Sequence, residues 1–399
     1  MSTMVPPRLS SPNHHIHVPI PGDHYTFLNG SAIMTLVYEF CRKHEAAGGR
    51  AQVLVARNSK YDYPAGECVP VDFGPWPDKR KKVADVALAR IGLQRRFINE
   101  MYAPALDAID PDFDGTIFIQ NTPGPIRQFK AKRPKAQVCV HVHNALFDTY
   151  GSRELHRTVD AADLVICNCH FLANQLLSRL KYGGEKIRIV YNGVDTERFV
   201  PRPELVSKEE VVILFVGRMV PTKGADLLID AALKVYGTGR RFKLRLIGNQ
   251  GFSADAPLSP YEVELRRMAE PLGKCVEFLP FMDRHRILPM YQSANIFCAP
   301  SNYDEPCTLV LPEAMACGAP SIGSSRGGIP EMGKGGILYF DTPNTSQLAD
   351  HFIHLIDDEG ARAEWSRRAR ARAEELDWAV QYRTLAEAIA PVSPAYAHA

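Results

Sequence analysis

The sequence lacks the features that mark a membrane-spanning or a nucleic-acid-binding protein. None of its apolar runs approaches the roughly 18 residues that a membrane-spanning helix needs. Lys and Arg number 47 against 45 Asp and Glu, whereas a dedicated nucleic-acid binder has a strongly basic domain. The N-terminal residues show no charged start followed by an apolar stretch, so we expect no signal peptide.

The sequence also lacks paired cysteines and a dinucleotide-binding motif. Its nine cysteines include no C-x-x-C pair, and several lie in apolar runs, such as Cys139 and Cys298. Buried free thiols in a reducing compartment explain this pattern better than disulfides do, so we expect a cytoplasmic protein. No G-x-G-x-x-G follows the first predicted strand, and a Rossmann dehydrogenase is therefore a poor fit.

Short apolar, β-branched runs alternate with amphipathic helical stretches along the whole chain. A first series of predicted strands comprises residues 51–56, 116–121, 137–143, 163–168 and 187–192. A second series comprises residues 211–217, 242–248, 276–279, 295–300 and 319–324. Because strands that alternate with helices form parallel sheets, two series predict two doubly wound α/β domains.

The two series are separated by a polar segment at residues 192–210. It contains Pro201 and Pro203 and shows no apolar period, which is typical of an interdomain linker. We therefore place an N-terminal domain at 1–198 and a C-terminal domain at 199–376. Ligands of open α/β sheets bind outside the carboxyl ends of the strands, so we expect the functional site in the cleft between the domains.

Two cations follow the first strand of the second series. Arg218 and Lys223 lie on the loop GRMVPTKG, next to a predicted helix N-terminus. Two cations and free backbone N–H groups form a site for an anion such as phosphate. The alternative is a solvated loop that happens to be basic.

The loop after strand 295–300 contains a second set of candidates. We expect a helix to begin near Thr308 with that residue as its N-cap, because Pro312 is tolerated only in a first turn. Backbone amides at the helix end would then face a diphosphate, namely those of Cys307, Thr308, Leu309 and Val310. Glu313 on the first turns would accept hydrogen bonds from a ribose diol, although an acidic residue near a helix N-terminus is also favoured by the helix dipole alone.

The first half contains fewer signals. Asn29–Gly30–Ser31 precedes a predicted helix, and a glycine there lets a phosphate or a sugar approach the helix N-terminus. His141 and His143 alternate on strand 137–143, so both face one side, and His143 lies at the carboxyl end. A hydrogen-bonded core histidine is the alternative.

Two further patterns concern metals and membranes. Asp110, Asp112 and Asp114 precede strand 116–121, at the edge of the sheet away from the ligand, and we expect them to form a turn rather than a metal site. The basic stretches 79–96 and 127–135 are consistent with contact to an anionic membrane or a lipid-linked acceptor. Solvated helix and loop surfaces are the alternative.

Taken together, the motifs in the second half closely resemble the family 4 glycosyltransferases, a large retaining family with the GT-B fold. The resemblance rests on NGVDTERFVP, FVGRMVPTKG, EPCTLVLPE followed by AMACGAPSI, and GGIPE, in the order of the family. It is strong over about residues 190–335, and the first half matches only through the NGS loop and the VHVHN strand end.

The resemblance implies two Rossmann-like domains facing across a cleft, with the final helix, 377–399, completing the N-terminal domain. It implies a retaining hexosyltransferase of polysaccharide biosynthesis that uses a UDP- or GDP-linked sugar and a glycan, lipid-linked or small-molecule acceptor. The implied donor contacts are Arg218 and Lys223 on the diphosphate, Glu305 on the sugar, Glu313 on the ribose and Met282 beside the base. His143 would lie near the sugar as a second catalytic group, with Gly30 near the phosphates.

One departure from the family concerns the donor sugar. The family usually has an aromatic residue and a glycine after Glu-Pro, where this chain has Cys307 and Thr308. A side chain at 308 narrows the space around the sugar, which leaves its identity open. We expect no cofactor and no divalent metal, since Arg218 and Lys223 with helix N-termini supply the positive charge.

Three alternative functions remain at this point. A GT-B sugar-nucleotide epimerase or a phosphorylase would use different cleft chemistry, and the phosphorylase would need pyridoxal phosphate on a lysine. A nucleotide-sugar-binding protein without transferase activity is the third. Release of nucleoside diphosphate distinguishes a transferase from a binding protein.

Overall fold

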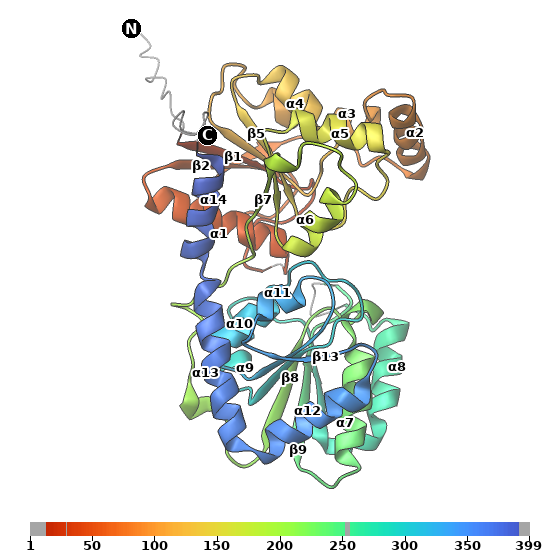
Figure 1. Ribbon diagram of the computed structural model, residues 1–399, viewed down its shortest axis with the longest axis vertical. Coiled ribbons are helices and arrows are strands. Elements are labelled where there is room, and N and C mark those ends of the chain that lie inside the picture. The colour runs from red at the N-terminus through yellow and green to blue at the C-terminus, as the bar shows by residue number, and fades with distance from the viewer. Residues whose placement is uncertain (1–12, 29, 252–255, 391–399) are drawn as a thin grey trace.

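The structure, a computed structural model, describes residues 13–28, 30–251 and 256–390. Two parallel sheets lie one above the other along the long axis of the molecule (Figure 1). This arrangement confirms the predicted fold class of two doubly wound α/β domains.

The first sheet has seven strands in the order β3-β2-β1-β4-β5-β6-β7. All its strand pairs are parallel. The strands are β1 His14–Val18, β2 Arg50–Ala56, β3 Glu67–Val71, β4 Thr116–Gln120, β5 Gln137–Val142, β6 Leu164–Cys167 and β7 Ile187–Ile189. The helices are α1 Ala32–Ala46, α2 Lys79–Arg90, α3 Arg96–Asp107, α4 Ile126–Lys132, α5 Ser152–Ala161 and α6 His170–Leu177.

The second sheet has six strands in the order β10-β9-β8-β11-β12-β13, again all parallel. The strands are β8 Val211–Val216, β9 Phe242–Ile247, β10 Val276–Leu279, β11 Ile296–Ala299, β12 Ser321–Ser324 and β13 Leu338–Phe340. The helices of this half are α7 Ala225–Tyr236, α8 Pro260–Ala269, α9 Leu288–Gln292, α10 Val310–Ala316, α11 Ile329–Gly333, α12 Thr345–Asp357 and α13 Glu359–Glu375.

Three strands of these sheets were not expected from the sequence: β1, β3 and β13. The omission of β1 matters most, because β1 is an interior strand of its sheet, between β2 and β4. Its sequence, HHIHV, contains three histidines, yet His15 and His17 are buried. Their rings pack against Phe118 of β4, with centroids 5.2 and 4.9 Å away.

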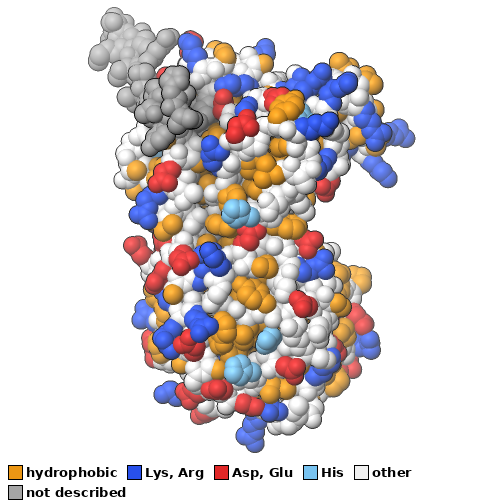
Figure 2. Space-filling model, viewed as in Figure 1, with side chains coloured by type: hydrophobic (Ala, Val, Ile, Leu, Met, Phe, Trp, Pro, Cys, Tyr) orange, Lys and Arg blue, Asp and Glu red, His pale blue; other side chains and the backbone are white. Residues whose placement is uncertain are grey.

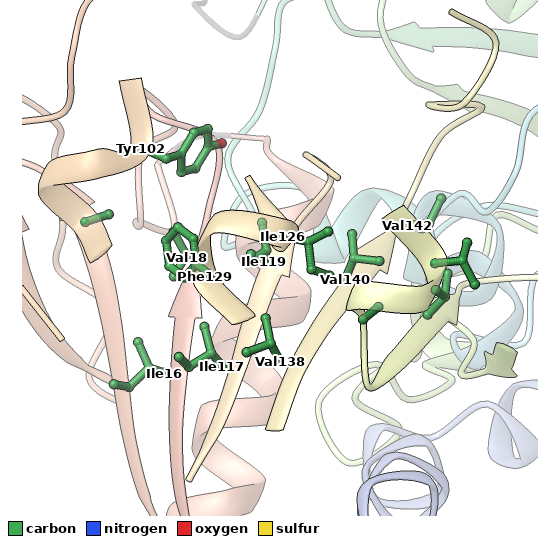
Figure 3. Close-up of a cluster of buried hydrophobic side chains, with 14 of the residues drawn as sticks. Ile16, Val18, Tyr102, Ile117, Ile119, Ile126, Phe129, Val138, Val140 and Val142 are labelled. Atoms are coloured by element: carbon green, nitrogen blue, oxygen red, sulfur yellow. The ribbon is translucent and has the colours of Figure 1, made fainter. Parts of the chain in front are cut away.

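The core of the first domain lies between the sheet and its helices. Ile117 and Ile119 of β4 point to the same face as Val138 and Val140 of β5, because alternate residues of a strand share a face (Figure 3). Phe129 of α4 covers them and is fully buried. A continuous apolar layer therefore fixes these two strands, whose carboxyl ends face the second domain.

The chain passes between the domains twice, and the two passages run side by side. Val194 N–H donates to the carbonyl of Leu376, and Trp378 N–H donates to the carbonyl of Val194, at 3.0 and 3.1 Å. The last described helix, α14 (Trp378–Ile389), then packs on α1 of the first domain (Figure 1). The hydroxyl of Tyr382 lies 2.8 Å from Nδ1 of His44 there. Residues 391–399 of the predicted C-terminal helix lie outside the described residues.

Candidate functional site

A cavity of about 540 Å³ lies between the carboxyl ends of the two sheets. Residues from both domains line it, including the ends of β5, β6, β8 and β11 and the start of α1. Every residue predicted from the sequence to contact the donor is among them: Gly30, His143, Arg218, Lys223, Met282, Glu305, Cys307, Thr308, Leu309, Val310 and Glu313. The structure thus brings together side chains that lie up to about 280 residues apart in the chain.

The loop after β8 presents Arg218 and Lys223 to this cavity. Gly224 closes the loop with a φ of +72°, and a Cβ there would lie 2.0 Å from the carbonyl oxygen of Pro300. Only glycine fits this position, and it holds the cations against the loop after β11. Among the described residues, Arg218 is exposed and has no ion-pair partner, so its guanidinium is available to an anion.

Lys223 is paired with a buried carboxylate. Its Nζ contacts Oε1 of Glu305, whose other oxygen accepts a hydrogen bond from the hydroxyl of Ser301. The side chains of Lys223 and Glu305 are 17% and 8% exposed. The ammonium and the hydroxyl thus satisfy the buried carboxylate, and the pair places a cation and an anion together at one wall of the cavity.

The glycines of the GGIPE motif position Glu305. The Gly328 N–H donates to the carbonyl of Glu305 at 2.7 Å. A Cβ at Gly327 would lie 2.4 Å from that carbonyl oxygen, and one at Gly328 would lie 1.7 Å from the carbonyl oxygen of Pro306. These glycines therefore allow close approach of the loop after β11.

Glu313 is held at the cavity by two partners that the sequence analysis did not identify. Its Oε1 lies 2.9 Å from Nη2 of Arg284, and the hydroxyl of Tyr291 donates to its Oε2 at 3.0 Å. Burial, and then the carboxylate of Glu313, raise the pKa of Tyr291 well above its ordinary value, so its hydroxyl stays a donor. Each carboxylate oxygen retains a second lone pair that can accept a ligand hydroxyl.

The start of α10 differs from the prediction. The helix begins at Val310 with Leu309 as its N-cap, and no side chain caps it, so the expected capping role of Thr308 is wrong. Leu309 already has a helical backbone conformation, with φ −88° and ψ −31°. Thr308 consequently lies on the incoming loop at the cavity wall. Burial raises the pKa of the adjacent Cys307 thiol well above its ordinary value, which keeps this thiol neutral.

His143 directly follows β5 and is 6% exposed. Its Nε2 lies 2.9 Å from Oε1 of Gln120, and its backbone N–H donates to Oδ1 of Asn121 at 3.1 Å. Burial lowers the pKa of His143 to about 3, so the ring is neutral at pH 7. With Gln120 Oε1 as acceptor, Nε2 bears the hydrogen and Nδ1 has a free lone pair.

The remaining predicted residues lie at the rim. Gly30 lies next to Ser31, the N-cap of α1, whose hydroxyl accepts from the Met34 N–H at 3.4 Å. Asn29 lies outside the described residues. Met282 lies on the loop after β10 and is partly buried against apolar side chains of the second domain.

The three aspartates that precede β4 lie at the amino end of that strand. Oδ1 of Asp110 accepts from the Asp112 N–H at 2.8 Å, which is a side-chain-to-backbone turn. Asp112 also pairs with Lys135 at 2.8 Å. The carboxyl end of β4, Gln120, is the end near the cavity, so these aspartates are remote from it.

Hydrogen bonds of Glu331 tie the two domains together beside the cavity. The carboxylate of Glu331, on α11 of the second domain, accepts from the N–H groups of His170 and Phe171 at 2.7 and 2.6 Å. These are the first residues of α6 in the first domain, where the helix dipole favours a negative charge. Tyr191 also donates to Glu331, at 3.2 Å. The glutamate of the GGIPE motif thus bridges the domains.

Comparisons with known proteins agree with this architecture. Residues 197–372 match the family described as Glycosyl transferases group 1, and residues 33–198 match the one described as Glycosyltransferase Family 4. Spore coat protein SA of Bacillus subtilis (strain 168) is 27% identical over 276 residues, which cover 65% of this chain and 73% of that protein.

A second relative is a D-inositol 3-phosphate glycosyltransferase of Mycolicibacterium smegmatis. It is 31% identical over 234 residues, 56% of this chain, and the match spans 51% of that protein, about half its length. Among solved structures, Anabaena Alr3699/HepE in complex with UDP superposes with a TM-score of 0.71 at 20% identity, over 94% of this chain and 98% of that one. Sucrose-phosphate synthase (tll1590) from Thermosynechococcus elongatus has the same TM-score and coverage at 19% identity. At these identities the two structures show the shared fold alone.

Proposed function

This chain belongs to glycosyltransferase family 4, and from that premise we propose that it transfers a sugar, with retention of anomeric configuration, from a UDP- or GDP-linked donor. The observation that supports this most directly is a cavity lined by Arg218 and by the pair of Lys223 with the buried Glu305. Glu313 lines the same cavity from α10. The solved relative that contains UDP is consistent with a nucleoside diphosphate donor.

In the proposed donor complex, the diphosphate contacts the free guanidinium of Arg218 and the ammonium of Lys223. Lys223 then lies between the phosphate and Glu305, while Ser301 continues to donate to Glu305. The loop that precedes α10, residues 307–309, provides further N–H donors on the phosphates. Glu313, oriented by Arg284 and Tyr291, accepts hydrogen bonds from the ribose hydroxyls.

In the proposed reaction, the bond between C1 of the sugar and the diphosphate oxygen breaks, and the diphosphate takes the electron pair. An acceptor hydroxyl forms the new bond to C1 on the same face and gives its proton to the departing diphosphate. The developing negative charge is stabilised by Arg218 and Lys223, because preorganised cations in a closed cleft need no reorganisation. This proposal requires no divalent metal and no cofactor.

The neutral ring of His143 has a positioning role in this mechanism. Since Nε2 donates to Gln120, Nδ1 is the atom available to a hydroxyl of the donor sugar. Such a bond orients the sugar as positive charge develops at C1, and its effect falls mainly on the transition state. Glu305, across the cavity, is the second group that we propose contacts the sugar.

The experiment that tests the proposal analyses both products. The protein is incubated with a panel of UDP- and GDP-sugars, sugar acceptors and excess chelator, and the glycoside formed is characterised by NMR. The proposal requires stoichiometric nucleoside diphosphate and a product with the donor's anomeric configuration. An inverted product, an epimerised nucleotide sugar, or donor binding without release of nucleoside diphosphate would contradict it and favour the epimerase or the binding protein.

A peripheral membrane contact is a second proposal, supported by the region around α2. Figure 2 shows Lys and Arg side chains gathered at the end of the first domain where α2 lies. Apolar side chains are exposed among them: Trp76 is 51%, Val83 63% and Ile91 73% exposed. Within the described residues no helix is long and apolar enough to cross a membrane. Exposed apolar groups among cations suit an anionic lipid surface and a lipid-linked acceptor.

Vesicle binding tests this contact. We expect binding to anionic vesicles that weakens as salt rises, and a further loss when Lys81 and Lys82 are both changed to Ala. Absence of binding at low salt would remove the proposal and leave the basic residues as a solvated surface.

A further inference from the structure

The wall of the cavity formed by the first domain differs in chemistry from the wall formed by the second. The second-domain wall has the cations Arg218, Lys223 and Arg284. Among the described residues of the first domain that line the cavity, Asp23 is the only one with a charged side chain, since His143 is neutral. Asp23 lies on the loop between β1 and α1, and its Oδ2 is 3.4 Å from the hydroxyl of Ser31.

The same wall contains two buried asparagines. Asn168, which follows β6, is 1% exposed, and Asn192, which follows β7, is 3% exposed. Both line the cavity, and among the described residues no donor reaches the Oδ1 of either one. The orientation of Asn192 is fixed because its Nδ2 donates to the carbonyl of Cys307 at 3.0 Å. Amide side chains have no formal charge, so the charge of this wall comes from Asp23.

We infer that the acceptor is an uncharged polyol or an amino sugar, and that Asp23 discriminates against acceptors with a phosphate or carboxylate group. Hydroxyl or ammonium groups of such an acceptor would donate to the carboxylate of Asp23, which lines the cavity and is half-buried. A phosphate monoester has no cation from this wall to pair with and would lie near the carboxylate of Asp23, which is unfavourable at short range in a partly dry cavity. This inference rests on the proposed transferase function and adds the class of its acceptor.

The inference contrasts with two of the similar proteins, whose names include a phosphorylated sugar or polyol. Likeness to either would suggest a phosphorylated acceptor. The first-domain wall described above, however, has no cation among its described lining residues. The acceptor preference of this chain therefore distinguishes the two expectations. The first-domain wall predicts a neutral acceptor, and the similarity to these proteins predicts a phosphorylated one.

The test compares matched pairs of acceptors with one donor: methyl hexosides against hexose 6-phosphates, inositol against inositol 3-phosphate, and glucosides against glucuronides. We expect the neutral member of a reacting pair to have a kcat/KM at least about 100-fold higher. Asp23→Asn should reduce this ratio at least about 10-fold, and Asp23→Lys should reduce it further. The matched control is Asp72→Lys, which makes the same charge change on an exposed side chain that pairs with Arg57.

Hydrolysis of the donor without acceptor separates the two proposals. If no nucleotide sugar is turned over, the proposed transferase function is wrong. If hydrolysis is normal but the charged acceptor reacts as well as the neutral one, the acceptor inference is wrong. It is also wrong if the Asp23 variants keep the wild-type ratio, as the Asp72 variant should. Asp23→Asn is nearly isosteric, so its thermal unfolding provides the check that the variant is folded.

Discussion

Replacement of Lys223 by Ala should have two separable consequences, one on the rate and one on stability. Removing one of the two cations proposed to contact the diphosphate should raise the barrier by at least about 2 kcal/mol, which is roughly a 30-fold loss in kcat/KM. It also leaves Glu305 buried with Ser301 as its remaining side-chain donor. An unpaired buried carboxylate costs about 3 kcal/mol of folding free energy, or roughly 6–12 °C in Tm for a domain of this size.

A second substitution distinguishes the two effects. In Lys223→Ala/Glu305→Gln the buried charge is gone, so most of the lost stability should return, whereas activity should stay low. Lys135→Ala is the matched control, because Lys135 forms an exposed pair with Asp112, far from the cavity. Such pairs contribute at most about 1 kcal/mol, and this variant should keep wild-type turnover.

The assay is nucleoside diphosphate release in excess chelator, with thermal unfolding of each variant measured in parallel. Three results would refute the reasoning. One is wild-type turnover in both Lys223→Ala and Arg218→Ala. Another is recovery of activity together with stability in the double variant. The third is strict dependence on magnesium or manganese.

The remaining predictions concern His143, the buried histidines and Glu331. His143→Ala should lower kcat with little change in donor affinity, and wild-type kcat would contradict the role proposed for Nδ1. Buried histidines are neutral in the folded protein but protonated in the unfolded chain, so the free energy of unfolding should fall as pH drops from about 6.5 toward 3, by up to about 1.4 kcal/mol per histidine and pH unit. The relevant pKa values are lowered by burial to about 2 for His15 and about 3 for His17 and His143. If the free energy of unfolding measured in urea is the same at pH 7 and pH 5, the buried histidines do not destabilise the folded protein at low pH. Glu331→Gln should weaken the bridge to α6 by about 1 kcal/mol and speed amide exchange at Phe171, and unchanged exchange there would assign Glu331 no bridging role.

The second domain was predictable because its strands are apolar and its motifs are local. Arg218 and Lys223 follow β8 within one loop. Glu305 lies in the loop after β11, and Glu313 lies on α10, which follows that loop directly. The rule that ligands bind at the carboxyl ends of parallel strands then placed them at one cavity. All of them line it.

The first domain was less predictable because β1, an interior strand of its sheet, is polar in sequence. The sequence HHIHV has only two apolar residues, too few for an alternation that indicates a buried strand. Its His17 is buried because Phe118 and Gln120 of the neighbouring strand β4 provide a ring contact and a hydrogen bond to this side chain. The edge strand β3 contains Pro70, which weakens the strand signal.

The partners of Glu313 were missed for a related reason. Arg284 and Tyr291 lie 29 and 22 residues before it, on the loop after β10 and on α9. Only the packing of these two segments against α10 brings them close. The unpaired oxygens of Asn168 and Asn192 are likewise a property of the assembled interface between the domains. Neither feature has a local sequence signal.

The most direct test of the central claim measures nucleoside diphosphate release from a panel of UDP- and GDP-sugars in excess chelator, for the wild type and for Arg218→Ala. We predict turnover of at least one nucleotide sugar by the wild type and at least a 30-fold loss in the variant, since about 2 kcal/mol of transition-state stabilisation depends on this cation. Absence of turnover with every nucleotide sugar, or equal turnover by both proteins, would contradict the claim that the cavity between the two domains is a glycosyl-transfer site.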